Sequence, residues 1–228
     1  MGVHISRIQS LTLDNIGTSQ LLIARVMSNS GFNDIMEASC NIKTQKPKPT
    51  STMEERNFFI RSKYIQKNFI IRTCTSESEL LNDLEQAVQT KDFFYLLQVW
   101  AEGAILTSHL PSNTVGETAL HYAVMNHCDS YSLHIVDFII QNSSNLNTIT
   151  RHEGNTALHY CVIYNRSECM KLLLRSKADY NIKNANGKTP LDIAREEHNA
   201  TLIELVSICI SFFLIFLIHI ILNSLKAL

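Results

Sequence analysis

The sequence predicts a mainly α-helical protein: a solenoid of helix pairs, preceded by part of an α+β domain and followed by a hydrophobic helix. Three observations support this prediction. A short phrase that opens a helix recurs in the second half of the chain, the first seventy residues lack that phrase, and the last twenty-four residues carry almost no charge.

The recurring phrase is GETALHYAV from Gly116 and GNTALHYCV from Gly154, with a degraded copy, GKTPLDIA, from Gly187. The copies begin 38 and 33 residues apart. A period near 33 residues with a T-P-L-H-x-A core is the signature of ankyrin repeats. In each copy the glycine supplies a turn and the next threonine can cap the following helix. We assign a structural role to the motif residues Thr118, His121, Thr156, His159 and Thr189.

His159 and Cys161 are a candidate thiol–imidazole pair, because they stand two positions apart in one motif. The preceding copy carries His121 with Ala123 in place of the thiol. If the pair were catalytic, the neighbouring repeat would not be expected to keep the histidine without the thiol. We therefore interpret Cys161 as a small packing residue between two close helices.

The segments after each motif place apolar residues at helical spacing, as in residues 133–139 and 169–174. Residues 80–106 look like a first, capping repeat with Gly103 at its turn. We therefore predict ankyrin repeats over residues 79–206, enough for a continuous core. Such solenoids present extended binding surfaces, so the expected partner is another protein, whose identity the sequence does not give.

Composition argues against several classes of function. The formal net charge of −1 and the lack of a long basic run leave no electrostatic footprint for nucleic acid. The six cysteines show no metal-ligand spacing and no signal peptide precedes them, so we expect reduced thiols in a cytoplasmic protein. Phosphate-loop, GxSxG and HExxH motifs are absent. We therefore assign no catalytic residue, no metal ligand and no cofactor within this chain.

The first 72 residues show a different pattern. We expect a strand over residues 3–13, short helices over 21–27 and 32–37, a polar linker over 40–53, and a helix over 54–69. The apolar side of that last helix should consist of Phe58, Phe59, Tyr64, Ile65 and Phe69. Its basic residues Lys63 and Lys67, with Arg72 beyond, should form a solvated face.

These residues also carry a resemblance. GVHISRIQSLTLDNIGTSQLLIARVMSNSGFNDIMEA, followed by RSKYIQKNF, closely resembles the C-terminal half of an Arf GTPase-activating domain. The succession into SLHIVDFIIQNSSNL and TALHYC is similar to the ASAP type, which joins this domain to ankyrin repeats, and the resemblance covers about residues 1–205. It implies a zinc-stabilised α+β domain at residues 1–72 that stimulates GTP hydrolysis on Arf, a small GTPase of membrane traffic.

The family's pattern also has parts that no residue of this chain matches. Its four-cysteine zinc site and its arginine finger both precede the residues that correspond to Gly2, Val3 and His4. We therefore treat residues 1–72 as a partial domain and expect zinc only in the complete family domain. Arg7 and Gln9 lie on the stretch that runs close to the GTPase in the family, although Arg7 as a surface charge remains an alternative. Half a domain should also leave the apolar side chains of Ile5, Ile8 and Phe32 without partners unless it docks on the repeats.

The C-terminal segment contains 21 residues without a formal charge, from 205 to 225. A helix of this length spans about 31 Å, which matches the hydrocarbon core of a bilayer. We predict a transmembrane helix that would leave the rest of the chain in the cytoplasm as a tail-anchored protein. A helix packed in the protein core and a read-through segment are the alternatives.

Two functions from different classes follow from these features. The first is a GTPase activator of the Arf type, present here as a fragment or short isoform that lacks activity alone. The second is a non-enzymatic, membrane-tethered ankyrin adaptor. In neither case is the chain itself expected to be an enzyme.

Overall fold

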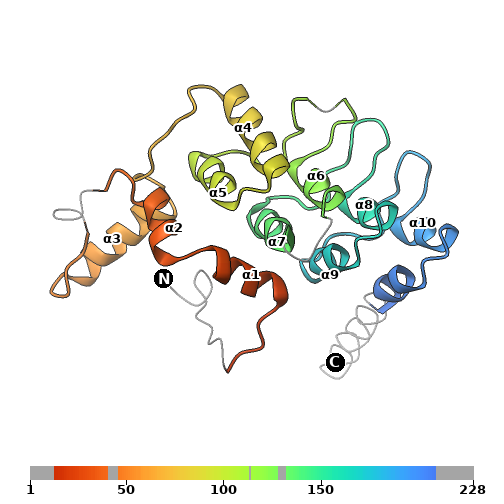
Figure 1. The fold of residues 1–228 in the computed structure, drawn as a ribbon, viewed down its shortest axis with the longest axis horizontal. Helices are drawn as coiled ribbons and strands as arrows, with labels where there is room; N and C mark the ends of the chain where they lie inside the picture. Colours follow the sequence, from red (N-terminus) through yellow and green to blue (C-terminus); the bar gives the residue numbers. More distant parts are fainter. Residues whose placement is uncertain (1–12, 41–45, 113, 128–131, 209–228) are drawn as a thin grey trace, which may run out of the picture. The chain divides into compact units, whose positions relative to one another are not determined.

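The computed structural model describes residues 13–40, 46–112, 114–127 and 132–208. Within these ranges every regular element is a helix, and the only pairing of extended residues is an isolated bridge between His109 and Thr118. The contacts divide the chain into two compact units, Met1–Ile105 and Leu106–Leu228. The prediction of a mainly helical protein is therefore confirmed for the described residues (Figure 1).

The described part of the first unit contains five helices, and α4 packs against α5 as a helix pair. The expected strand lies almost entirely outside the described residues. Gly103, at φ 109°, ends α5 in the left-handed conformation that favours glycine, at the turn where the sequence placed it. The helices are α1 (Thr18–Val26), α2 (Asn29–Met36), α3 (Met53–Tyr64), α4 (Glu77–Thr90) and α5 (Phe93–Glu102).

Helix α2 packs on α5, and this contact gives the front segment its apolar core. Met36, Ile70 and Ala101 form a buried cluster, and Phe32 packs against it. The Phe32 ring also stacks on Tyr64 with centroids 6.0 Å apart. Phe32 therefore gains its partners by packing on the first helix pair, which is the condition under which we expected it to have one. Ile5 and Ile8 lie outside the described residues.

The Glu102 carboxylate fastens the segment between α3 and α4 to the end of α5. Its two oxygens accept hydrogen bonds from the backbone N–H groups of Thr73 and Cys74, at 2.9 and 3.0 Å, and from the Thr73 hydroxyl at 2.8 Å. Although burial opposes ionisation, these bonds and one from Gln98 hold the pKa of Glu102 below its ordinary value. The ionised Glu102 carboxylate thus joins the segment between α3 and α4 to the C-terminal end of α5.

The prediction that Lys63 lies on a solvated face is wrong. Lys63 is buried, and its Nζ donates to Asn33 Oδ1 at 2.5 Å and Glu37 Oε1 at 2.6 Å, which ties α3 to α2. Lys67 is half-buried, with its Nζ 3.5 Å from the centre of the Trp100 ring and donating to the Trp100 carbonyl. Of the three basic residues predicted to form a solvated face, only Arg72 is exposed.

Helix α3 is also shorter than expected and buries a different side. It ends at Tyr64, because the chain turns back so that the Asn68 N–H donates to the Ser62 carbonyl and Lys67 takes a positive φ of 52°. Phe59 and Phe69 are buried as predicted, whereas Phe58 and Ile65 are exposed.

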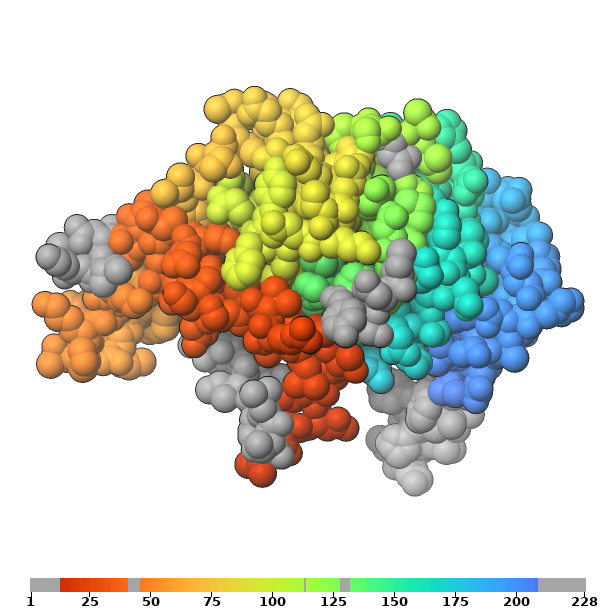
Figure 2. All heavy atoms as spheres, viewed as in Figure 1, coloured from red at the N-terminus to blue at the C-terminus, as the bar shows by residue number. Residues whose placement is uncertain are grey.

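In the second unit, α6, α8 and α10 lie side by side in one row, and α7 and α9 pack behind them (Figure 1). A further helix over 200–208 follows α10, with Leu202 and Val206 buried. Figure 2 shows the successive repeats of this unit stacked in chain order from green to blue. The labelled helices are α6 (Ala119–Met125), α7 (Leu133–Asn142), α8 (Ala157–Ile163), α9 (Ser167–Arg175) and α10 (Pro190–Glu196).

The turns before these helices connect one repeat to the next. Gly116 and Gly154 adopt φ values of 77° and 65°, which side chains rarely tolerate. Glycine is required at Gly116 for a second reason, because a Cβ there would lie 2.3 Å from the Arg151 side chain. Backbone hydrogen bonds join adjacent turns, from Arg151 N to Val115 O at 3.0 Å and from Ala185 N to Glu153 O at 2.8 Å.

The expected hydrophobic C-terminal helix falls mainly outside the described residues, which end at 208. Within the ranges that the structure describes, no helix is long and apolar enough to cross a bilayer.

Candidate protein-binding site

The motif histidines join each helix start to the following repeat. Thr118 and Thr156 are the N-caps of α6 and α8, and the backbone N–H of each donates to the histidine Nδ1 three residues later. The opposite ring nitrogen donates to the next repeat, from His121 Nε2 to the Asn155 carbonyl and from His159 Nε2 to the Lys188 carbonyl, both at 3.0 Å. Since a carbonyl only accepts and an N–H only donates, both imidazoles are neutral with the proton on Nε2.

Burial keeps these rings neutral. It lowers the pKa of His121 to about 4, and the bond to the Asn155 carbonyl opposes this only in part. Burial lowers the pKa of His159 in the same way. A second proton on either ring would occupy Nδ1 and abolish the acceptor that the threonine N–H needs.

The last copy of the motif replaces histidine with Asp192. Its carboxylate accepts from the Thr189 N–H at 3.0 Å and from the Thr189 hydroxyl at 2.7 Å, so the helix cap is retained. These bonds lower the pKa of Asp192. A carboxylate has no proton to donate onward, so this residue caps its helix without requiring a carbonyl from a further repeat.

The pairing of Cys161 with His159 does not form a reactive site. Both nitrogens of His159 are engaged by Thr156 and Lys188. Cys161 is fully buried, and burial raises the pKa of its thiol well above the ordinary value, which suppresses the reactive thiolate. The structure thus supports the packing role expected for Cys161.

One surface of the second unit consists of the residues one, four and five positions after the motif histidine or aspartate. This spacing places them on one side of α6, α8 and α10, which lie next to each other. We call this surface the inner-helix face. It comprises Tyr122, Met125, Asn126, Tyr160, Ile163, Tyr164, Ile193, Glu196 and Glu197.

The centre of the inner-helix face is apolar and exposed. Ile163, the last residue of α8, and Tyr164, its C-cap, are 46% and 36% exposed. Tyr160 is buried between them and α6: its hydroxyl donates to Glu117 Oε1 at 2.5 Å, and its ring meets His121 and Tyr164 edge-on. Burial and the Glu117 carboxylate raise the pKa of Tyr160 far above its ordinary value, so the phenol remains a hydrogen-bond donor.

Polar contacts at the helix ends join the neighbouring repeats that form this face. Arg166 Nη2 donates to the Met125 carbonyl at 3.0 Å, which joins the turn after α8 to the end of α6. The equivalent turns of the next pair are joined by Asn199 Nδ2 and Asn165 Oδ1 at 3.0 Å. A face that is fixed before binding loses little conformational freedom when a partner docks.

The residues predicted from sequence are not the ones exposed to a partner. The motif residues Thr118, His121, Thr156 and His159 are buried, so their role is structural. Arg7 and Gln9, the positions expected to face a GTPase, lie outside the described residues. Sequence reasoning missed Ile163 and Tyr164, although their fixed distance from His159 would have identified them.

The described residues contain no group of three or more His, Cys, Asp or Glu side chains that could hold a metal ion. Cys40, for example, lies beside Glu37 and the basic groups of Lys46 and Lys63, and burial raises the pKa of its thiol. The described side chains therefore do not fit a zinc site.

Two family models match the chain. Ankyrin repeats (three copies) match residues 84–184 and 128–210, which together cover more than half of the chain. A model described as a putative GTPase-activating protein for Arf matches residues 1–73.

Three relatives resemble the chain; the name of the first refers to ankyrin repeats, and the names of the other two refer to Arf GTPase-activating proteins. A putative ankyrin repeat protein of fowlpox virus is 43% identical over 46% of this chain and 30% of its own length. The yeast ADP-ribosylation factor GTPase-activating protein effector protein 1 is 28% identical over 70% of this chain and 36% of its own. A human Arf-GAP with coiled-coil, ANK repeat and PH domains, number 3 of its kind, is 35% identical over 31% of this chain and 8% of its own. The chain thus spans about a third, or less, of the length of these relatives.

The buried imidazoles predict that stability falls as the pH drops from about 6.5 towards 4. In this window the unfolded chain binds protons on its histidines while folded His121, with its lowered pKa, does not. Each such histidine reduces the free energy of unfolding by up to about 1.4 kcal/mol per pH unit. Urea unfolding at pH 7, 6 and 5 measures this slope.

Replacing His121 and His159 with glutamine should flatten the dependence between pH 7 and 5, because glutamine cannot take up a proton. His152→Gln is the matched control, since His152 is exposed. The carboxylates Glu37 and Glu102, whose pKa values are lowered, titrate below this window. An unchanged slope in the double variant would show that the two imidazoles are not the titrating groups.

Proposed function

Because the chain belongs to the ankyrin-repeat family and its first 73 residues match the family of Arf GTPase-activating proteins, we propose that it is an Arf-GAP-like, protein-binding protein of membrane traffic. In this proposal residues 1–72 contact an Arf-family small GTPase, and the repeats bind a second protein through the inner-helix face. The relatives' names support the first role, because two of the three names describe Arf GTPase-activating proteins.

The exposure of Ile163 and Tyr164 is the observation that carries the protein-binding role. Two large apolar side chains stand exposed at the middle of a row of helices that is otherwise well packed. Tyrosine and large aliphatic side chains at the centre of a surface are typical anchors of protein interfaces. The glutamates of α10, Glu196 and Glu197, border this centre and would form a polar rim.

A photo-crosslinking residue at position 163 should therefore capture the partner in cells, whereas the same residue at position 175 should not. Arg175 is the matched control because it is exposed on α9, outside the inner-helix face. Ile163→Asp should weaken the purified complex about tenfold or more, as expected for a central anchor. Equal crosslinking from both positions would contradict the assignment of this face.

For the GTPase, we expect the chain to bind GTP-loaded Arf without accelerating hydrolysis, since no residue matches the family's arginine finger. Such a finger contributes about a thousandfold or more to the rate. Single-turnover GTP hydrolysis and a binding titration measure the two properties separately. Arg7→Ala should weaken binding, and Arg72→Ala, at an exposed position, should not. Acceleration that disappears in Arg7→Ala would instead identify Arg7 as a finger.

The alternative proposal is a non-enzymatic ankyrin adaptor held on a membrane by residues 205–225. The uncharged 21-residue segment favours it. In this case the chain should remain in the membrane pellet after alkaline carbonate extraction, and a version that ends at Glu204 should be released. Release of both forms would rule out the anchor and leave the chain without the proposed membrane attachment.

A further inference from the structure

The inner-helix face changes from apolar to acidic between α8 and α10. The positions four and five after the motif histidine of α8 are Ile163 and Tyr164, whereas the same positions after Asp192 of α10 are Glu196 and Glu197. Helix α10 packs beside α8, and the axes of packed helices lie about 10 Å apart. The exposed apolar centre of the face is therefore followed, one helix further on, by two carboxylates.

The two glutamates lie where the fold does not favour a negative charge. Glu196 is the last residue of α10 and Glu197 is its C-cap, and both are exposed. The backbone dipoles of a helix disfavour negative charge at its C-terminal end. Glu196 is compensated by Lys188, with Nζ and Oε2 2.5 Å apart, but Glu197 forms no ion pair within the residues that the structure describes. The Glu197 carboxylate therefore does not stabilise the end of its helix.

Carboxylates also lie near the exposed tyrosine. Burial, followed by the negative charges of Glu117 and Glu153, raises the pKa of Tyr164. The ring of Tyr160 meets Tyr164 edge-on with centroids 5.4 Å apart, and the same two carboxylates act on it. The face of a tyrosine ring attracts cations. The Tyr164 ring and the surrounding carboxylates thus favour the same kind of group, a cation.

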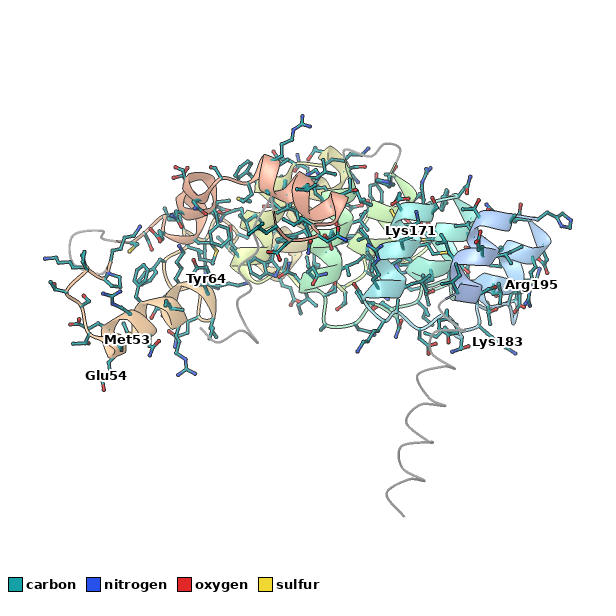
Figure 3. All side chains as sticks on the ribbon, turned by 90° about the horizontal axis from the view of Figure 1, so that it is seen from below. Met53, Glu54, Tyr64, Lys171, Lys183 and Arg195 are labelled. Carbon is teal, nitrogen blue, oxygen red and sulfur yellow. The ribbon has the colours of Figure 1, made fainter. Side chains whose placement is uncertain are left out.

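The inner-helix face itself contains no lysine or arginine. In the turns that border it, the Arg151 side chain packs over Gly116, and Arg166 donates to the Met125 carbonyl. Figure 3 labels three further basic residues of this unit, all outside the face: Lys171 on α9, Lys183 in the segment before α10, and Arg195, which lies three positions after Asp192. The cation that would complement Glu197 therefore has to come from a partner.

We propose that the inner-helix face binds a basic protein segment. A large apolar side chain of this segment contacts Ile163 and Tyr164, and a lysine or arginine contacts Glu197. Because the two contacts lie about 10 Å apart, the apolar and basic residues are about seven positions apart in a helical segment or three in an extended one. This inference rests on the protein-binding role proposed above and adds the charge and spacing that the partner must have.

Random peptides displayed on phage test the proposal, with the full 228-residue chain as bait. Each selected peptide is then tested against Ile163→Gln, which removes the apolar anchor without changing the charge of the face. The peptides that lose binding to this variant are those that occupy the face. They should carry a net positive charge, with a large apolar residue and a lysine or arginine at one of the two expected spacings.

Titrations of these face-dependent peptides, made synthetically, measure the role of Glu197. Glu197→Gln should weaken their binding about two- to fivefold, as expected for one exposed ion pair, and Glu197→Lys about tenfold or more. Glu204→Gln should change binding less than twofold. Glu204 is the matched control because it is an exposed glutamate in the helix after α10, outside the inner-helix face.

Glu197→Gln should not lower the melting temperature of the free chain, because it removes a negative charge from a helix C-terminus. Face-dependent peptides without an excess of lysine and arginine, or equal binding to the Glu197→Gln and Glu204→Gln variants, would overturn the proposal while leaving the face as a binding site. A selection that yields no peptide dependent on Ile163 would contradict the protein-binding role of the face, and this inference with it.

Discussion

The neutral imidazole between two repeats is the interaction on which the second unit depends. His121 and His159 each accept a hydrogen bond from the start of their own helix and donate one to the carbonyl of the next repeat. A single side chain therefore fixes both the local helix start and the spacing to its neighbour. Because the ring is buried, it performs both tasks only in its neutral form.

The inner-helix face follows from the same constraint. Once the histidine fixes the rotation of each helix, the residues one, four and five positions later share one side of that helix. Tyr160 then reaches back to Glu117 and becomes buried, whereas Ile163 and Tyr164 stay exposed. The repeat thereby separates residues that build the solenoid from residues that are available to a partner.

The first unit is held by a different kind of contact, between the front segment and the first helix pair. Glu102 binds the segment that follows α3, Lys67 reaches the Trp100 carbonyl, and Phe32 packs on the cluster that contains Ala101. Helix α5 supplies residues to all three contacts. The front segment therefore shares its apolar core with a helix that the repeat pattern assigned to the ankyrin block.

The sequence alone determined the period of the repeats, their helix starts and the small residue at Cys161, because these depend on neighbours within a few positions. The partners of Phe32 and Lys63 could not be predicted, since both depend on segments distant in sequence. Lys63 looks like a surface residue until α2 brings Asn33 and Glu37 to it. Phe58 looks like a core residue, but none of the described segments covers it. Only the tertiary structure decided these positions, because burial is set by which segments meet and not by the polarity of a side chain.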